Sequence, residues 1–217
     1  MSIKSLSSKM INDRGGDMSS INDLKRFADD AASSLFSDLS SALKLASTGL
    51  VPDFASCVEF CFVKNPRVIV CGVGKSGLVG QKISATLSST GTPSFFLHAG
   101  EASHGDMGAI CRDDLVLMIS NSGNTSELLP VIHYCKNYNI ASAGISSNGS
   151  STLMTNVDFK LCLPNCEESG PLGLAPTTST ILALALGDAF AMALMKVRNF
   201  SRDDFKRYHP AGNLGFK

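Results

Sequence analysis

Apolar residues follow two patterns along this chain of 217 residues, and the first of them is helical. Between positions 17 and 47 they recur every three or four residues on one face, which predicts a long amphipathic helix that stops near Gly49. A second helix is expected from Pro52 to about Asn65. The two helices predict an N-terminal helical arm, preceded by a Ser-rich, polar and flexible tail at residues 1–16.

The second pattern is a set of short, continuous apolar runs without polar alternation. Runs of this kind are typical of strands buried on both faces of a parallel sheet. Helical stretches separate them, which predicts an α/β fold: a single three-layer α/β/α domain over residues 17–217 with a five-stranded parallel sheet. The expected strands are 67–71, 94–97, 115–119, 141–146 and 159–163.

The helices between the strands carry expectations of their own. A helix over 126–138 contains Pro130, which should bend it or remove one hydrogen bond. A turn at Asn148 and Gly149, followed by a short helix, is expected before the last strand. The stretch 180–197 is nearly all apolar, but a charged residue interrupts it and it is shorter than the ~20 residues of a membrane span. It predicts a buried helix at a subunit contact.

The central strand leads directly into a loop of small hydroxyl and amide side chains, which we call the serine loop (residues 120–125). The loop lies where the next helix begins, and a helix N-terminus presents free N–H groups and partial positive charge, so the loop can hold a phosphate without Arg or Lys. The alternative is a plain helix cap made by Asn124 with Glu127. The candidate phosphate ligands are Ser120, Asn121, Ser122, Gly123 and Thr125.

A second turn with ligand-binding character follows the first strand and reads GVGKSG, the glycine turn (residues 72–77). Its GxGxxG spacing occurs in dinucleotide sites, but no acidic residue for a ribose follows about 20 positions later. An ATP-type P-loop would need Gly at position 69 and has Ile69. Lys75 is therefore interpreted as a point charge beside a ligand, and Ser76 next to it is a further candidate phosphate ligand. The alternative for Lys75, a solvated lysine at a helix start, is opposed by the helix dipole.

Composition limits the kind of partner. Lys and Arg total 19, as do Asp and Glu, so no long-range field recruits nucleic acid or an anionic membrane. The seven cysteines show no CxxC pair, which argues against a disulfide framework and against a zinc cluster and fits a reducing cytoplasm. The polar N-terminus lacks the apolar segment of a secretion signal.

An ordered set of motifs resembles the D-arabinose 5-phosphate isomerases of the sugar isomerase (SIS) superfamily. The resemblance covers about residues 67–215 and implies a flavodoxin-like SIS fold and a homotetramer. It also implies interconversion of D-ribulose 5-phosphate with D-arabinose 5-phosphate on the route to Kdo, the lipopolysaccharide and capsule sugar. The motifs are GVGKSG (72–77), STGTPS (89–94), His98 with GEASHGD (100–106), SNSG (120–123), PLGLAPT (171–177) and HPAG (209–212).

The resemblance also implies site residues. No cofactor is expected, because enediol chemistry can run on acid–base groups alone and the sequence offers no cluster of metal ligands. The ligand contacts of the family correspond to Gly91, Thr92, His98 and His104, and His98 resembles a position where zinc binds as an inhibitor. This sequence has Asn124-Thr125 where Glu-Ser is frequent, and it stops at Lys217 where many relatives continue into CBS domains. The functionally important positions of the family correspond to Lys75, Glu127, Glu168 and His209.

The residue types suit aldose–ketose isomerisation, which needs a base to move a proton next to a carbonyl through an enediol. Glu127 or Glu168 could move the proton, since burial or neighbours can bring a glutamate pKa near neutral. Lys75 would stabilise the oxyanion, and His104 or His209 would open the sugar ring. Two other interpretations stay open: a non-catalytic sugar-phosphate sensor of the same fold, and a nucleotide-dependent oxidoreductase.

Overall fold

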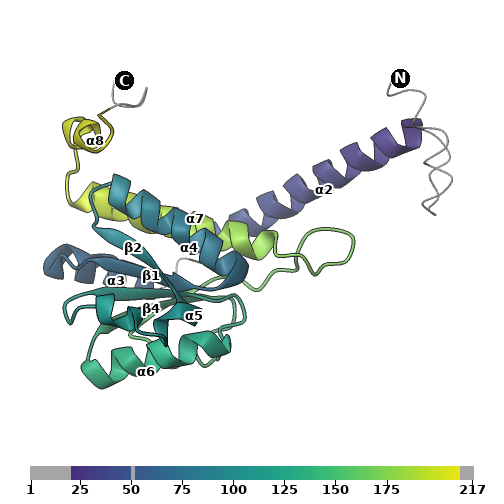
Figure 1. Ribbon diagram of the computed structural model, residues 1–217. Coiled ribbons are helices and arrows are strands. Elements are labelled where there is room, and N and C mark those ends of the chain that lie inside the picture. The colour runs from purple at the N-terminus through teal and green to yellow at the C-terminus, as the bar shows by residue number, and fades with distance from the viewer. Residues whose placement is uncertain (1–20, 50–51, 211–217) are drawn as a thin grey trace, which may run out of the picture.

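A parallel sheet of five strands forms the centre of the structure, a computed structural model that describes residues 21–49 and 52–210 (Figure 1). All four strand pairings are parallel, which confirms the predicted α/β class. Each predicted strand is present, and none of its bounds differs from the prediction by more than one residue. The strands are β1 (Val68–Gly72), β2 (Ser94–His98), β3 (Leu115–Ile119), β4 (Ala141–Ser146) and β5 (Phe159–Cys162).

The strand order in the sheet is β2-β1-β3-β4-β5. The chain starts in the middle at β1, moves outward to β2, and then crosses back to β3 on the other side of β1. This is the flavodoxin-like order, in which ligands bind at the carboxyl ends of the two strands that flank the reversal. The reversal lies between β1 and β3, so the glycine turn and the serine loop begin at the same place on the sheet edge.

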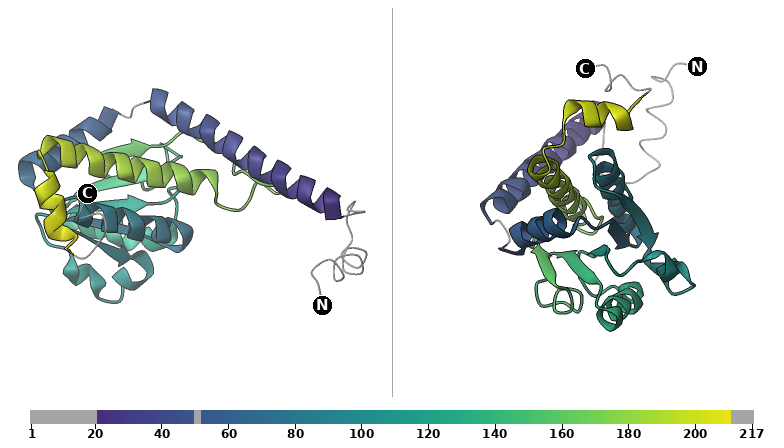
Figure 2. Two further views of the ribbon diagram at one scale, coloured as in Figure 1. Left: turned by 90° about the horizontal axis from the view of Figure 1, so that it is seen from above. Right: turned by 90° about the vertical axis from the view of Figure 1, so that its left-hand side faces the viewer.

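Helices cover both faces of the sheet and bury every residue of β1 and β3. One face carries α3 (Pro52–Lys64), α4 (Gly74–Ser89) and α7 (Thr178–Val197), whose Cys57, Ile83 and Phe190 pack on Val70 and Leu117. The other face carries α5 (Ala99–Ala102) and α6 (Leu129–Tyr138). Figure 2 shows the three layers, and they account for the lack of polar alternation in these strands.

Two local predictions were wrong. The helix expected over 126–138 is divided into a 3₁₀ turn, η2 (Ser126–Leu128), and α6. Pro130 therefore stands in the first turn of α6, where its missing N–H costs no helical hydrogen bond, and it bends nothing. The short helix expected before β5 is a series of turns over residues 149–157 instead.

The helical arm is present as α2 (Ile21–Thr48) followed by α3; the predicted tail and the start of the first helix lie outside the described residues. α3 joins the body, but α2 projects well beyond it (Figure 1). Of the α2 residues, Ala42 is buried, whereas large apolar side chains remain exposed: Leu24, Phe27, Phe36, Leu43 and Leu45. Exposed large apolar side chains of this kind mark a surface that another chain can bury.

α7 is longer than the sequence predicted, so its length alone does not exclude a membrane span. It has 20 residues with a hydropathy of 1.7, so length and composition alone would allow it to cross a membrane. Its packing indicates a helix of the globular domain instead, because Leu182, Phe190 and Leu194 are buried in the core against the sheet. Its one acidic residue, Asp188, is paired with Lys82 of α4 at 2.5 Å.

The contact between α7 and α4 generates a test of the core. Gly187 lies against Ile83, and a methyl group at Gly187 would overlap the side chain of Ile83. Gly187→Ala should therefore lose about 2–3 kcal/mol to overpacking, against the ~1 kcal/mol that alanine gains in a helix, which leaves a net loss of about 1–2 kcal/mol. We expect the melting temperature at fixed protein concentration to fall by about 2–8 °C.

A second substitution controls for the mechanism. Adding Ile83→Ala to Gly187→Ala opens the space that the new methyl group needs, so the double variant should lose less stability than the sum of the two single variants. Strict additivity, or a melting temperature that rises in Gly187→Ala, would show that the two helices do not meet closely at this point.

Candidate active site

The glycine turn lies where α4 begins, directly after β1. A Cβ atom on Gly72 would stand 3.3 Å from the backbone N of Gly77 and from the carbonyl oxygen of Ile119. The glycines thus let α4, β1 and β3 approach closely, which is a packing reason for the GxGxxG spacing that involves no dinucleotide. The approach leaves Lys75 exposed and Ser76 half-buried in the first turn of α4.

The serine loop is held in shape by its own hydroxyl groups. Ser120 is buried, and its Oγ lies 2.7 Å from Oγ1 of Thr125. The same Oγ accepts the N–H of Gly123 at 3.0 Å, so Ser120 orders the loop from inside. Gly123 has φ +67°, and a side chain there would overlap Ser151, which requires glycine at this position.

The exposed side of the serine loop is where an anion can bind. Ser122 is exposed, and its Oγ accepts a hydrogen bond from the N–H of Asn124 at 3.3 Å, which leaves the hydroxyl proton available to a ligand. In the part of the chain that the structure describes, the N–H groups of Ser122 and Thr125 donate to no protein acceptor. A phosphate needs donors of this kind at close spacing.

The alternative of a plain helix cap is wrong. α6 begins at Leu129, and neither α6 nor η2 has a side-chain cap. The Oδ1 atom of Asn124 instead accepts the N–H of Thr152 at 2.9 Å. Asn124 thus ties the serine loop to the segment after β4, and the loop does not serve as the cap of α6.

Sequence reasoning missed this segment after β4 as a support of the site. Ser146 and Ser147 both donate their hydroxyl protons to the carbonyl oxygen of Asn121, at 2.9 and 3.0 Å. The N–H of Leu153 donates to the carbonyl oxygen of Gly123 at 2.9 Å. The available signal was the Ser-Ser-Asn-Gly stretch at the end of a parallel strand next to the central one, because neighbouring strands end at the same edge.

Glu127 lies on η2, immediately after the serine loop, and is exposed. Its Oε2 accepts a hydrogen bond from Oγ of Ser126 at 2.8 Å. This bond, with one from the backbone and with the charge of His98 close by, holds the pKa of Glu127 below its usual value. The proximity places His98, the last residue of β2, on the same edge as Glu127.

His98 and His104 flank the short helix α5, and both are exposed. α5 contacts η2, so the two predicted histidines lie on the Glu127 side of the serine loop. Together with Lys75 they border one edge of the sheet, where an incoming anion meets a lysine and two imidazoles.

Glu168 precedes α7 and caps its N-terminus. The carboxylate accepts hydrogen bonds from the N–H groups of Thr177, at 2.8 Å, and Ser179, at 3.1 Å, and also from the Ser179 hydroxyl. Desolvation raises the pKa of Glu168, but these hydrogen bonds outweigh it and leave the pKa below its usual value. Ser179 lines a small cavity together with Ser76 and Asn121, so the capped turn borders both ligand-binding turns.

The expected rise of a glutamate pKa toward neutral is therefore wrong for the single chain. Both Glu127 and Glu168 are in the ionised form at neutral pH, because the hydrogen bonds that each carboxylate accepts lower its pKa. An ionised carboxylate is the form that accepts a proton. Either glutamate is thus in the protonation state that a general base requires.

Three predicted site residues lie away from this edge within one chain. Gly91 and Thr92 precede β2, at the opposite end of the strands, where Thr92 is buried and accepts a hydrogen bond from Arg198 at 2.7 Å. A Cβ atom on Gly91 would meet the ring of Phe200 at 2.6 Å. His209 follows α8 (Arg202–Tyr208) and stacks on Phe205; Figure 1 shows α8 beyond the end of α7, far from α5.

Metal binding has little support in the residues present. Over residues 21–49 and 52–210, no group of three or more His, Cys, Asp or Glu side chains could hold an ion. A structural or catalytic zinc site uses at least three protein ligands. His98, with Glu127 near it, is an incomplete donor set within one chain, and no step of a reaction is assigned to a metal there.

Comparison with known proteins gives consistent results. Arabinose 5-phosphate isomerase KdsD of Yersinia pestis is 50% identical over 165 residues, 76% of this chain and 50% of the relative. KpsF of Escherichia coli, also named arabinose 5-phosphate isomerase, is 53% identical over 149 residues, 69% of this chain and 47% of the relative. This chain thus spans about half the length of these curated relatives.

A solved structure resembles the whole body of the molecule. The E. coli CFT073 protein c3406, solved in complex with arabinose 5-phosphate, superposes with a TM-score of 0.81 at 35% identity and covers 88% of this chain and 100% of its own. Residues 62–193, which include the sheet, both ligand-binding turns and most of α7, match the SIS domain. From the fold, the position of the serine loop and these matches, the chain belongs to the SIS domain family.

Proposed function

We propose that the protein is an aldose–ketose isomerase that interconverts D-ribulose 5-phosphate and D-arabinose 5-phosphate through an enediol. The observation that carries the proposal is the serine loop at the strand reversal, with free donors for a phosphate on one side and Lys75 and Glu127 beside it. Relatives about 50% identical are named arabinose 5-phosphate isomerases, and the solved neighbour holds arabinose 5-phosphate. The pathway would be the one that leads to Kdo.

The proposed roles follow from position and charge. The serine loop and Ser76 bind the phosphate and thereby place C1 and C2 of the open-chain sugar. Lys75 stabilises the oxyanion that forms as the enediol develops, and an ionised glutamate moves the proton between the two carbons. Both Glu127 and Glu168 border the site, and Glu127, which is exposed and accepts fewer hydrogen bonds, is the freer of the two to accept a proton. The histidines at 98 and 104 contact the sugar.

The active site is proposed to be shared between subunits of a homotetramer. One end of the molecule carries Gly91, Thr92 and His209, and the serine loop lies at the other end. Gly91 lies against Phe200, which stacks on Tyr208 next to His209, and Arg198 donates to Thr92. A neighbouring chain that brings this end to the serine loop would add Gly91 and His209 together, with the buried Thr92 directly behind Gly91. The exposed apolar side chains of α2 supply surface for such an assembly.

The proposed compartment is the cytoplasm. All seven cysteines are free thiols, and Cys111 is exposed, which suits a reducing environment. The proposed reaction needs no cofactor, and His98 is a position where zinc would compete with the sugar and inhibit.

Turnover tests the function directly. Incubated with D-ribulose 5-phosphate alone, the protein should form D-arabinose 5-phosphate, followed by NMR of the C1 and C2 signals. A parallel sample with chelator should be equally or more active, because acid–base groups suffice for an enediol. Binding without turnover would favour the sugar-phosphate sensor, and activity that disappears with chelator and returns with a divalent ion would contradict the metal-independent mechanism.

The phosphate role of the serine loop has its own test. Ser122→Ala removes an exposed hydroxyl that anchors a non-reacting group, so it should raise KM about tenfold and leave kcat within about threefold, since such an anchor acts equally in ground and transition states. Ser33→Ala, an exposed serine on α2 away from the serine loop, is the matched control and should change neither constant. A kcat reduced a hundredfold at unchanged KM would place Ser122 in the chemistry instead.

Mixed oligomers test the shared site. His209→Ala and Glu127→Ala should each lower activity by about 10²- to 10⁴-fold as pure oligomers. Dissociated, mixed and reassembled, the two variants form some sites with Glu127 from one chain and His209 from another, and those sites should recover a sizeable fraction of wild-type activity. Mixed oligomers that are verified by native mass spectrometry and stay inactive would show that His209 does not act across a subunit boundary.

A further inference from the structure

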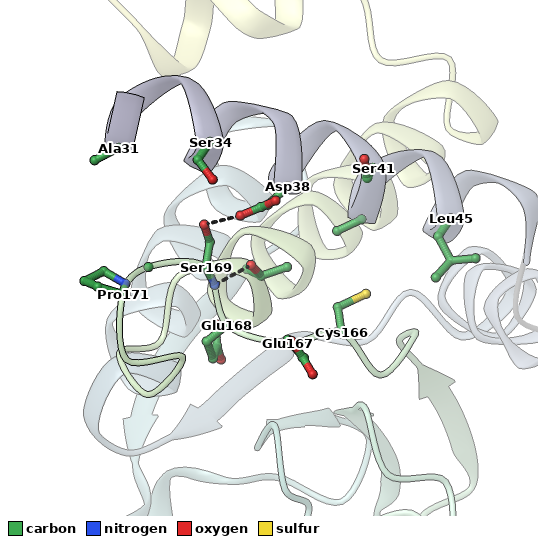
Figure 3. Close-up of a pocket in the computed structure, with 13 residues that line it drawn as sticks. Ala31, Ser34, Asp38, Ser41, Leu45, Cys166, Glu167, Glu168, Ser169 and Pro171 are labelled. Atoms are coloured by element: carbon green, nitrogen blue, oxygen red, sulfur yellow. Dashed lines mark hydrogen bonds between the residues drawn. The ribbon is translucent and has the colours of Figure 1, made fainter. Parts of the chain in front are cut away.

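The loop that carries Glu168 is held from two sides. Glu168 and Ser169 are adjacent, yet their side chains point to opposite sides of the loop: Ser169 toward α2 and Glu168 away from it (Figure 3). Glu168 is bound to the first turn of α7 through Thr177 and Ser179. Ser169 is bound to the long helix α2, which has no place in the mechanism described above.

The contact with α2 is a hydrogen bond between residues 131 positions apart in the chain. The hydroxyl of Ser169 donates to Oδ2 of Asp38 at 2.6 Å. A bond to a carboxylate is short and stronger than one between neutral groups. Ser169 is buried, so its hydroxyl would lose its acceptor if Asp38 lost its carboxylate.

Further hydrogen bonds carry this contact to the turn that holds Glu168. The N–H of Ser169 donates to Oγ1 of Thr178 at 3.2 Å, and its carbonyl oxygen accepts the hydroxyl of Thr177 at 3.0 Å. Thr177 is also a donor to Glu168. The chain of contacts thus runs from Asp38 through Ser169 to the residue that fixes the Glu168 carboxylate.

Apolar packing does not replace this tether, because a cavity separates the two elements. A hollow of about 690 Å³ lies between α2 and the loop, lined by Ser34, Ser41 and Leu45 on the helix and by Cys166 and Pro171 on the loop (Figure 3). The side chains across it are mostly small. The loop next to α2 is therefore fixed by a hydrogen bond and not by a filled core.

We propose that Asp38 is a positioning residue for the isomerase: through Ser169 it fixes the loop that presents Glu168 to the sugar. The proposal rests on the function proposed above, in which Glu168 borders the site as one of its two ionised glutamates. Asp38 touches no substrate. Its effect is geometric, and a displacement of about 1 Å at a reacting group can cost on the order of 10²-fold in rate.

Two substitutions of Asp38 separate the hydrogen bond from the helix. Asp38→Ala removes the acceptor, and kcat should fall about 10- to 100-fold with KM within about threefold, because the phosphate contacts lie on other loops. Asp38→Asn keeps an oxygen acceptor for the Ser169 hydroxyl and should retain kcat within about threefold. Asp30→Ala, an exposed aspartate two turns earlier on α2, is the matched control and should leave both constants unchanged.

The loop itself gives a readout that does not depend on activity. Hydrogen exchange measured by mass spectrometry should become faster across residues 166–177 in Asp38→Ala than in the wild type, and not in Asp38→Asn. Ser169→Ala should lower kcat like Asp38→Ala, and the double variant should be no worse than either single variant, since both remove one contact. Oligomeric mass is recorded for each variant, so that a loss of assembly is seen as such.

Several results would overturn the proposal. Faster exchange in Asp38→Ala with unchanged kcat would mean that the tether orders the loop without serving catalysis. Unchanged exchange and unchanged kcat would mean that the hydrogen bond fixes nothing. A wild-type protein that shows no turnover would remove the proposed function, while the exchange result would still decide whether Asp38 holds the loop.

Discussion

The closeness of three backbones at the strand reversal is the constraint on which the rest of the site depends. β1, β3 and the first turn of α4 meet at Gly72, where a side chain would stand 3.3 Å from the carbonyl oxygen of Ile119. Because no side chains intervene, the glycine turn and the serine loop leave the sheet side by side. A larger residue at Gly72 or Gly77 would separate Lys75 from the phosphate donors without touching either.

The site is built in layers of decreasing burial. Ser120, Ser146 and Gly123 are buried and fix the shape of the serine loop, while Ser122 and Glu127 are exposed and can meet a ligand. The same division separates Ser169, which is buried, from the carboxylate of Glu168. The shape of the site is thus set by hydrogen bonds of buried groups, which lie behind the groups that a sugar phosphate would contact.

Much of the fold was predictable from the sequence because buried parallel strands leave a direct signal. The runs at β3 and β4 predicted both strands to the residue, and the position of the serine loop followed from the end of β3. The effect of Pro130 was predicted wrongly because a 3₁₀ turn precedes α6 and moves the start of the helix by three residues. The spacing of apolar residues does not distinguish a 3₁₀ turn from the first turn of an α-helix.

Contacts between distant segments were the part that sequence could not supply. The role of Asn124, the support from Ser146 and the bond between Asp38 and Ser169 each join elements that are adjacent only after folding. The pKa of Glu168 likewise depends on donors from the first turn of α7, whereas the main donor to Glu127 is the adjacent Ser126. The motifs in the sequence also assigned Gly91, Thr92 and His209 to the site, but one folded chain does not bring these residues to the serine loop.

The serine loop has a consequence for the behaviour of the proposed enzyme when product accumulates. Its ligand donors are hydroxyl and N–H groups. The two proposed sugar phosphates present the same phosphate to them on the same carbon. The loop then binds product about as well as substrate, so the two sugars would compete for one site. Sustained net flux toward the aldose would therefore depend on a following reaction that removes it.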